Sequence, residues 1–455
     1  MKLNNFSKLL LSAFVMVCLA SSCVKEGPMG ATGATGANGK DGVDGKDANE
    51  TCKACHTSTK VDLISTQFQF SKHEYGEAAF EEAGTTGCAP CHEQEGFKDV
   101  VARKVPSTFT LNASTGKYTN DYACSSSTAY GEIGCSTCHS SLHTTYGTAD
   151  LAFTTVAPVS MTMWGGKKTI DLPADNHKSN LCVKCHQPRP QQNMQNSNVQ
   201  DYEALVNNPT GIAWDANNPT ATTNIIRPSY RMHVHYGSVG AIYAGMGGIE
   251  FKGAEPYKNS AHTTVASCVD CHMGAMVERA GGHTFKVRNS TDGTGLTAQT
   301  KWNLTTCNVA GCHTSEIKTT STLWAATRAE IKGLLDQLAA KLVVVKPDGT
   351  KVDILNRNSD PSTNLWAGIT TNNYDGYLNV YDPVLAPNAG LQNSNSSSFT
   401  AEQKAINSAL PKLSLTNAQY GALLNFQLCL REYSLGIHNT LYTRALLKNS
   451  IAILP

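Results

Sequence analysis

The residues in this sequence that could carry chemistry form a repeated cysteine and histidine motif. The chain has five copies of the pentapeptide C-x-x-C-H, which run from Cys52 to His56, Cys88 to His92, Cys135 to His139, Cys182 to His186 and Cys268 to His272. Two thiols and a histidine at this spacing are what covalent attachment of a c-type haem requires. The cysteines form thioethers to the porphyrin, and the histidine becomes the proximal iron ligand. The repeat therefore predicts several attached haems.

A stretched copy, Cys307 to His313, reads CNVAGCH and predicts a sixth haem, because a longer loop can still bring both sulfurs to one porphyrin edge. A structural disulfide is the alternative there. Zinc would need a second ligand pair to close each tetrahedron, and it gives no reason for histidine after every second cysteine. The predicted thioether residues are Cys52, Cys55, Cys88, Cys91, Cys135, Cys138, Cys182, Cys185, Cys268, Cys271, Cys307 and Cys312. The predicted proximal ligands are His56, His92, His139, His186, His272 and His313.

Only two of the sixteen cysteines, Cys124 and Cys429, lie outside both these motifs and the N-terminal leader. They could pair in an oxidising compartment, but the sequence gives no information on their proximity. The question of a disulfide therefore stays open at this stage.

The fourteen histidines are numerous enough to give every iron a second imidazole. Beyond the proximal ligands, eight remain: His73, His143, His177, His233, His235, His262, His283 and His438. Six irons need at most six of them. Two imidazoles close the coordination sphere, which favours electron transfer over substrate binding.

The chain from Cys52 onward resembles known multihaem c-type cytochromes, including extracellular electron conduits and the wider group around cytochrome c nitrite reductases. The phrases that carry the resemblance are FSKHEYGEAAFEEAGTTGCAPCH, GCSTCHSSLHTTY, NLCVKCHQPR, HYGSVGAIYAG, NSAHTTVASCVDCHM, GGHTF and SLGIHNTLYTRALL. In that group, histidines in such contexts serve as distal ligands. The resemblance thus implies distal roles for His73, His143, His235, His262, His283 and His438, with His177 and His233 in reserve. It also implies a fold organised around stacked haems, and some filament-forming relatives exchange ligands between subunits.

Two functions follow as hypotheses. The first is an electron carrier that passes electrons along six haems between the cell envelope and an external or periplasmic acceptor, with redox proteins as partners. The alternative is a multihaem reductase of nitrite, hydroxylamine or another oxyanion, with one haem left open. The nitrite reductase group typically has a lysine as proximal ligand at its catalytic haem, whereas all six motifs here end in histidine. This departure favours the carrier and assigns no catalytic residue.

The N-terminus predicts export and a lipid anchor. Residues 1–22 have the layout of a signal peptide, with Lys2 and Lys8 before a twelve-residue apolar run that is too short to span a bilayer. Small residues directly before Cys23 resemble a bacterial lipobox, which would make Cys23 the lipidated first residue; ordinary cleavage nearby is the alternative. We therefore expect a lipoprotein of the cell envelope, facing the periplasm or lying at the cell surface on the outer membrane.

Residues 23–50 contain seven Gly-x-y triplets, from Gly27 to Asp47, which predict a collagen-like tether. So few triplets, with Pro28 as their only proline, would form a weak triple helix, so a flexible polar tether is favoured over trimerisation. Stacking into an oligomer or filament is left open.

The formal net charge is +1, and it becomes −1 once the two leader lysines are removed. The propionates of six haems would make the loaded protein acidic. The chain has no basic patch of the kind that nucleic acid requires.

The elements that must position these ligands are expected to be short helices after each motif, joined by long loops. The sequence thus predicts a mainly α fold with a high loop content, in which a multihaem domain over residues 51–320 packs against a helical region over residues 321–455. Helical periodicity is seen in Leu323 to Val345, Ala401 to Ala409 and Asn417 to Ile453, with a turn at Pro347 to Gly349. Asn356 to Ser398 reads as loop, where Asn358 and Asp360 could bind calcium, although a solvated loop is the simpler interpretation.

Overall fold

The computed structural model describes residues 56–57, 59–74, 85–125, 131–189, 202–221, 224, 226–230, 232–289, 302–314, 316–357, 374–386, 392 and 400–455. The chain divides into two units, Met1–Glu50 and Thr51–Pro455. The predicted signal peptide, Cys23 and the tether lie outside the described residues, as do Asn358 and Asp360. Among the described residues, no helix has the length and apolar character needed to cross a membrane.

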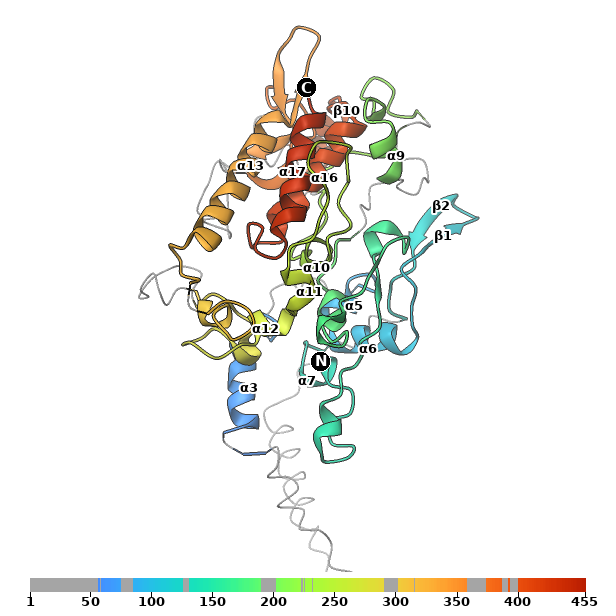
Figure 1. The fold of residues 1–455 in the computed structure, drawn as a ribbon. Helices are drawn as coiled ribbons and strands as arrows, with labels where there is room; N and C mark the ends of the chain where they lie inside the picture. The colour runs from blue at the N-terminus through green and yellow to red at the C-terminus, as the bar shows by residue number, and fades with distance from the viewer. Residues whose placement is uncertain are drawn as a thin grey trace, which may run out of the picture. The chain divides into compact units, whose positions relative to one another are not determined.

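Helices are the main regular elements of the second unit (Figure 1). The α-helices are α3 (Val61–Gln69), α5 (Ala89–His92), α6 (Gln94–Ala102), α7 (Cys135–Cys138), α8 (Asn180–Val183), α9 (Tyr202–Asn207), α10 (Val239–Ala244), α11 (His262–Val265), α12 (Cys268–His272), α13 (Thr327–Lys341), α15 (Ala401–Ala409), α16 (Asn417–Arg431) and α17 (Thr440–Ile453). Short 3-10 turns are η1 (Thr148–Leu151), η2 (Thr162–Trp164), η3 (Pro173–Asp175), η4 (Gly282–Thr284) and η5 (Leu304–Thr306), and a π-helical turn, η6 (Thr322–Ala326), leads into α13.

The strands form small antiparallel pairs. They are β1 (Phe109–Asn112) with β2 (Lys117–Asn120), β3 (Val159–Ser160) with β4 (Thr169–Ile170), β5 (Ile212–Trp214) with β10 (Leu415–Thr416), β6 (Val343–Val345) with β7 (Lys351–Asp353), and β8 (Leu355–Arg357) with β9 (Tyr374–Leu378). Each described sheet has two strands, so no sheet forms a layer of the core.

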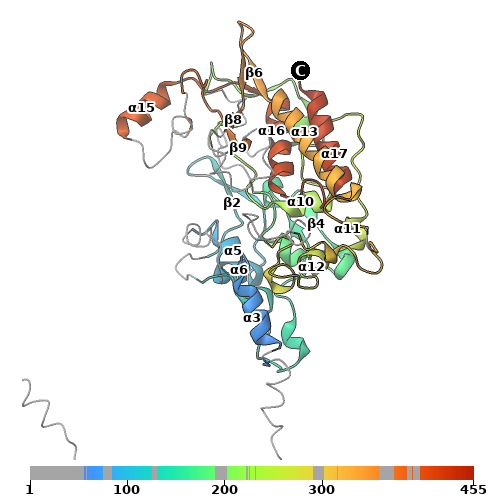
Figure 2. The same ribbon diagram turned by 90° about the vertical axis from the view of Figure 1, so that its left-hand side faces the viewer.

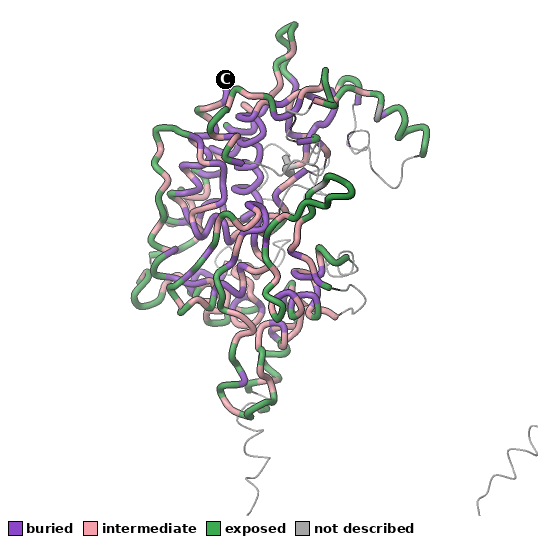
Figure 3. The backbone as a smooth tube through the Cα atoms, turned by 90° about the vertical axis from the view of Figure 1, so that its right-hand side faces the viewer, coloured by how far each residue is buried: buried purple, intermediate pink, exposed green. Residues whose placement is uncertain are grey.

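The core is built around α16, in which every residue is buried. Helices α13 and α17 pack on it, and all three run side by side in Figures 1 and 2. Thr416 and Gln419 form a capping box that fixes the start of α16. Figure 3 shows the buried backbone concentrated in these helices. The same hydrophobic cluster includes Val159, Met232 and Leu446, so residues from both predicted regions, 51–320 and 321–455, share one core.

Polar side chains of α16 also hold the segments on either side of α10. The Asn425 amide accepts a hydrogen bond from the Ile249 amide at 2.8 Å and donates to its carbonyl at 2.7 Å. The Gln427 amide donates to the carbonyl of Met232 at 2.7 Å. Since these atoms are buried, each bond satisfies groups that would be costly to leave unpaired. Helix α16 therefore holds the two ends of residues 232–249, a stretch that includes His233 and His235.

Three expected elements differ from the sequence prediction. The predicted helix Leu323 to Val345 ends at Lys341, and its last residues form β6, because a run of β-branched valines before the Pro347 to Gly349 turn suits a hairpin. The loop expected over Asn356 to Ser398 contains strand β9, whose Leu378 pairs with Leu355. Short helices occur within several motifs, as in α5, α7 and α12, and one, α6, directly follows its motif as expected.

Candidate functional site

Each pentapeptide whose cysteines are described folds into a helical turn. The amide of the motif histidine donates to the carbonyl of the first cysteine at 3.2 Å for His92, 2.9 Å for His139 and 3.0 Å for His186. A fourth motif forms helix α12. Residues three and four apart lie on one face of a helix, so the turn presents both thiols and the imidazole together. Cys52 and Cys55 lie outside the described residues; His56 lies within them.

The stretched motif closes an equivalent turn despite its two extra residues. The His313 amide donates to the Cys307 carbonyl at 3.2 Å. Asn308 anchors the loop, because its side chain both donates to and accepts from the backbone of Ile317, at 2.9 and 3.1 Å. Gly311, at φ +89, supplies the left-handed residue that the longer loop needs. The geometry thus suits the same kind of attachment as in the other motifs.

Every motif histidine lies near a second histidine from elsewhere in the chain. We number the sites 1 to 6 in motif order. The pairs are His56 with His143 (site 1), His92 with His235 (site 2), His139 with His283 (site 3), His186 with His73 (site 4), His272 with His438 (site 5) and His313 with His262 (site 6). The second members are the six histidines for which the resemblance implied a distal role.

The spacing within five of these pairs fits one iron ion between two imidazoles. Ring centres are 5.6 Å apart at site 1, 6.0 Å at sites 2 and 4, 6.3 Å at site 5 and 6.2 Å at site 6. Metal–imidazole bonds of about 2 Å, with roughly 1 Å more from each nitrogen to its ring centre, put the two centres about 6 Å apart. At site 1 the two Nε2 atoms face each other at 3.3 Å, within hydrogen-bond distance, so they would have to separate by somewhat less than about 1 Å to admit an iron. A porphyrin would supply the remaining iron ligands.

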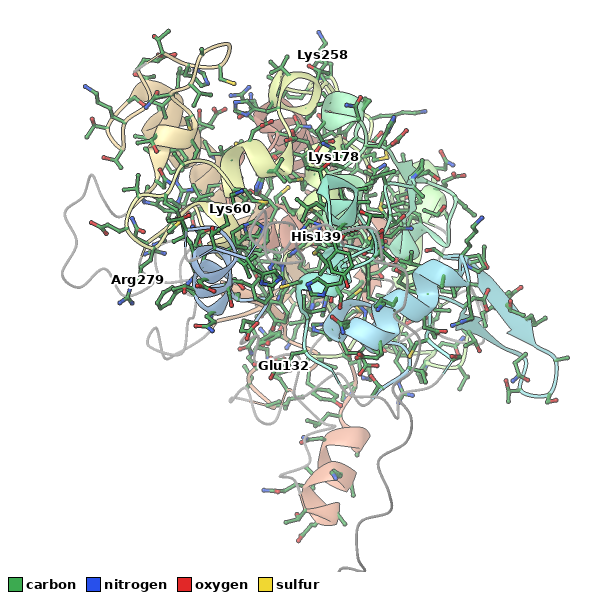
Figure 4. All side chains as sticks on the ribbon, turned by 90° about the horizontal axis from the view of Figure 1, so that it is seen from below. Lys60, Glu132, His139, Lys178, Lys258 and Arg279 are labelled. Carbon is green, nitrogen blue, oxygen red and sulfur yellow. The ribbon has the colours of Figure 1, made fainter. Side chains whose placement is uncertain are left out.

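At site 3 the two histidines are close enough for the charge of His139 to act on His283. Burial, and then the charge of nearby His139, lowers the pKa of His283. The backbone amide of His283 donates to Gln67 Oε1 of α3 at 2.9 Å, which ties this histidine to that helix. Figure 4 places His139 near the middle of the view from below, with the charged side chains of Lys60 and Glu132 farther out.

Backbone carbonyls orient several of these rings. The Nδ1 atoms of His139, His186 and His272 lie 2.9, 3.2 and 2.8 Å from the carbonyl oxygens of residues 151, 237 and 285. A carbonyl can only accept, so each Nδ1 carries the proton and each Nε2 keeps the lone pair that binds a metal. Such partners are the usual supports of metal-binding histidines. Gly237, at φ +62, turns its carbonyl toward His186.

Two histidines use carboxylates instead. His313 Nδ1 donates to Glu316 at 2.9 Å, and His438 Nδ1 donates to Glu432 at 2.5 Å. The Glu316 side chain is 46% exposed, whereas the Glu432 side chain is 0% exposed. Burial opposes the charge of Glu432, but hydrogen bonds from His438, Gly436 and Ser434 hold the pKa of that carboxyl below its ordinary value.

Burial keeps several of the paired imidazoles neutral. It lowers the pKa of His73 to about 4, of His235 to about 3 and of His272 to about 4, with nearby positive charges as the smaller cause. It also lowers the pKa of His186, though a hydrogen bond to Gly237 opposes the shift. Neutral imidazole is the form that binds iron, so these rings are ready to act as ligands near neutral pH.

Phe285 connects three of the sites. Its ring lies 4.9 Å from that of His73 and 5.8 Å from that of His283, and its carbonyl accepts the bond from His272. It is held at φ +54, which is strained for a phenylalanine. His143 and His235 are also left-handed, at φ +62 and +86. Strain of this kind is typical of functional sites, and here it coincides with the histidine pairs.

The two reserve histidines have other contacts. His177 Nδ1 donates to Asp171 at 2.6 Å. His233 Nδ1 accepts the amide N–H of His235 at 3.0 Å, and its ring lies 6.3 Å from that of His235, the second member of site 2, and 4.9 Å from that of Tyr236. Neither has a described ring contact with a motif histidine.

The thiols of neighbouring motifs also meet. Cys91 contacts Cys185 through a side-chain hydrogen bond, and Cys182 contacts Cys268 in the same way. Cys124 and Cys429 are buried in separate hydrophobic clusters, so the fold does not bring these two cysteines together. No group of three or more His, Cys, Asp or Glu side chains in the described residues could hold a metal ion without further ligands.

Sequence reasoning did not identify Glu432, Glu316 or Phe285. A glutamate six residues before a histidine has no recognised pattern, and the role of Phe285 depends on a backbone carbonyl that only the fold places. Glu316 lies three residues after His313. This short spacing was the one local signal that could have identified a hydrogen-bond partner of a motif histidine. Comparison with known proteins gave no matching family model, no matching curated protein and no matching solved structure.

Proposed function

We propose that this chain is a multihaem c-type cytochrome that carries electrons along six covalently bound haems. The observation that carries the proposal is the pairing of every motif histidine with a second histidine, at a spacing that suits one iron in five pairs. A single pair could arise by chance in a histidine-rich chain. Six pairs that use each motif histidine once, and that use twelve of the fourteen histidines, are difficult to explain otherwise.

The pairing favours a carrier over a reductase. A reductase needs one iron with an open position for its substrate, whereas two imidazoles close the coordination sphere. Each of the six sites has a candidate for both axial positions, and no site has been left with its motif histidine alone. The reductase therefore has no observation in its favour among the described residues.

Contacts between sites support a continuous path. Phe285 links sites 3, 4 and 5, and the thiol contacts link site 2 to site 4 and site 4 to site 5. His262 of site 6 lies 3.1 Å from the carbonyl of Ile437, the residue before His438 of site 5. His139 of site 3 and His143 of site 1 are four residues apart. Site 4 is thus a branch point with neighbours on three sides.

The location that fits this role is the cell envelope. The predicted signal peptide, lipidated Cys23 and Gly-x-y tether would hold the haem domain at a membrane surface, from which it would pass electrons to a periplasmic or external acceptor. His56 of site 1 follows the tether by only a few residues, so site 1 would lie closest along the chain to the anchor.

The test combines a haem count with ligand binding. The mature protein, made in a host that attaches c-type haems, should carry six haems by intact mass, and its ferric and ferrous spectra should be low-spin. Cyanide, nitrite and carbon monoxide (the last after reduction) should leave those spectra unchanged. One ligand-binding haem per chain would contradict the carrier and favour the reductase, and a protein without attached haem would overturn both.

A further inference from the structure

The buried carboxylate of Glu432 accepts a hydrogen bond from the imidazole of His438, a candidate iron ligand. Glu432 follows α16, and its side chain is 0% exposed. One of its oxygens accepts the Nδ1–H of His438 at 2.5 Å and the hydroxyl of Ser434 at 2.6 Å. The other accepts the amide of Gly436 at 3.0 Å. Three donors thus hold the carboxylate as an anion in a position from which solvent is excluded.

The groups that accept Nδ1–H bonds from the other histidines carry less charge than Glu432 or are more exposed to water. At sites 3, 4, 5 and 6 a backbone carbonyl, which is neutral, orients one of the rings. Glu316 at site 6 is an anion, but it is 46% exposed, and water screens its charge. At site 5, a backbone carbonyl accepts the Nδ1–H of the proximal His272, and a buried carboxylate accepts the Nδ1–H of the distal His438.

We propose that Glu432 is a positioning residue that acts through His438 to give site 5 the lowest reduction potential of the six; this rests on the proposed function. A carboxylate that accepts the Nδ1–H makes the imidazole a stronger electron donor through Nε2. Stronger donation stabilises ferric over ferrous iron, and hydrogen bonding of this kind is one of the means by which a protein sets haem potentials. A buried anion adds to the effect because little solvent screens it.

Arg328 is the cation that faces this carboxylate. Its guanidinium donates to the Ser434 carbonyl at 2.6 Å, and its charge interacts with Glu432 without a hydrogen bond between the two. The positive charge of Arg328 offsets part of the negative field that Glu432 creates at site 5. It does not remove the bond between Glu432 and His438, on which donation to the iron depends.

The experiment measures all six potentials by spectroelectrochemical titration of the haem-loaded protein. Glu432→Gln keeps the side-chain shape and removes the charge, so the lowest of the six potentials should shift upward while the other five stay in place. Glu316→Gln is the matched control at an exposed carboxylate, and it should produce a smaller shift in a different potential. Asp171→Asn, at the partner of His177, which belongs to none of the six sites, should leave all six potentials unchanged.

Ser434→Ala tests the role of Glu432 by a shift of the reduction potential in the opposite direction. It also replaces Glu432→Gln if that variant fails to fold. Without the Ser434 hydroxyl, more of the negative charge of Glu432 is available to His438, so the lowest potential should fall further. Six attached haems with the lowest potential unmoved in both variants would overturn this inference and leave the proposed function standing. A wild-type protein with fewer than six haems by mass would count against the proposed function itself.

Discussion

At the scale of single residues, the C-x-x-C-H turns could be predicted from the sequence, and the groups that orient their histidines could not. The spacing C-x-x-C-H encodes a helical turn and is local, so His139, His186 and His272 are recognisable by eye. The carbonyls that orient these rings belong to residues 151, 237 and 285, which lie 12 to 51 positions away in sequence and outside the motifs. Any residue type has such a carbonyl, so only the fold identifies these partners.

His438 offers a test of a distal ligand. His438→Ala should convert one low-spin haem into a haem that binds cyanide or carbon monoxide, because site 5 would lose its second imidazole. The measurement is the ferric and reduced absorption spectrum with and without ligand. His177→Ala is the control, since that ring contacts Asp171 instead of a motif histidine, and it should leave the spectrum unchanged. An unchanged spectrum in His438→Ala would exclude this histidine as an iron ligand.

The stretched motif can be tested by mass. Replacing both Cys307 and Cys312 with alanine should reduce the intact mass by one haem, because these thiols would form the thioethers of site 6. The single substitution Cys124→Ala, at a cysteine outside the motifs, should leave the haem count at its wild-type value. If the double variant kept the full number of haems, Cys307 and Cys312 would have to serve another purpose, such as a disulfide.

At the scale of elements, the C-terminal helices do more than pack against the haem region. The sequence predicts a helical stretch from Asn417 to Ile453, and the structure divides it into α16 and α17. The segment between them contains both Glu432 and His438, so the break supplies site 5. Helix α15 matches the predicted range Ala401 to Ala409, where the capping residues Thr400 and Gln403 gave a local signal. The break after α16 had no comparable signal before the fold placed Glu432 in the core.

The core role of α16 predicts a large stability cost for truncation. Phe426 is 0% exposed within the main cluster, so Phe426→Ala should lower the free energy of unfolding by about 3 to 5 kcal/mol. The change in the free energy of unfolding is measured by urea denaturation, with circular dichroism as the readout. The exposed Lys404→Ala on α15 should change stability by no more than about 0.5 kcal/mol. Equal effects of the two substitutions would show that α16 is not the centre of the core.

The ring planes predict two spectroscopic classes of haem. The planes are nearly parallel at sites 1 and 5, at 20° and 16°, and steeply inclined at sites 2, 4 and 6, at 89°, 74° and 82°. The orbital splitting of low-spin ferric iron depends on this angle. Electron paramagnetic resonance of the oxidised protein should therefore contain both rhombic and strongly anisotropic signals. One uniform signal from all haems would contradict these orientations.

At the scale of the whole molecule, both histidines of each of the six sites come from one chain. The sequence could count the histidines, but it could not pair them, because each pair joins residues 51 to 166 positions apart along the chain. No ligand from a second copy is needed at any of these sites. Dilution of the haem-loaded protein should therefore leave its low-spin spectrum unchanged, whatever its oligomeric state. A ligand-accessible haem that appears on dilution would point to a histidine exchanged between copies.

The most direct test of the six histidine pairs is to locate the irons. Anomalous diffraction at the iron edge from crystals of the haem-loaded protein should give six iron positions per chain, each between the two histidines of one numbered site. His177 and His233 should bind none of them. An iron with only its motif histidine as a protein ligand, or with a distal ligand other than the one paired with it here, would contradict the central claim that six closed histidine pairs make this chain an electron carrier.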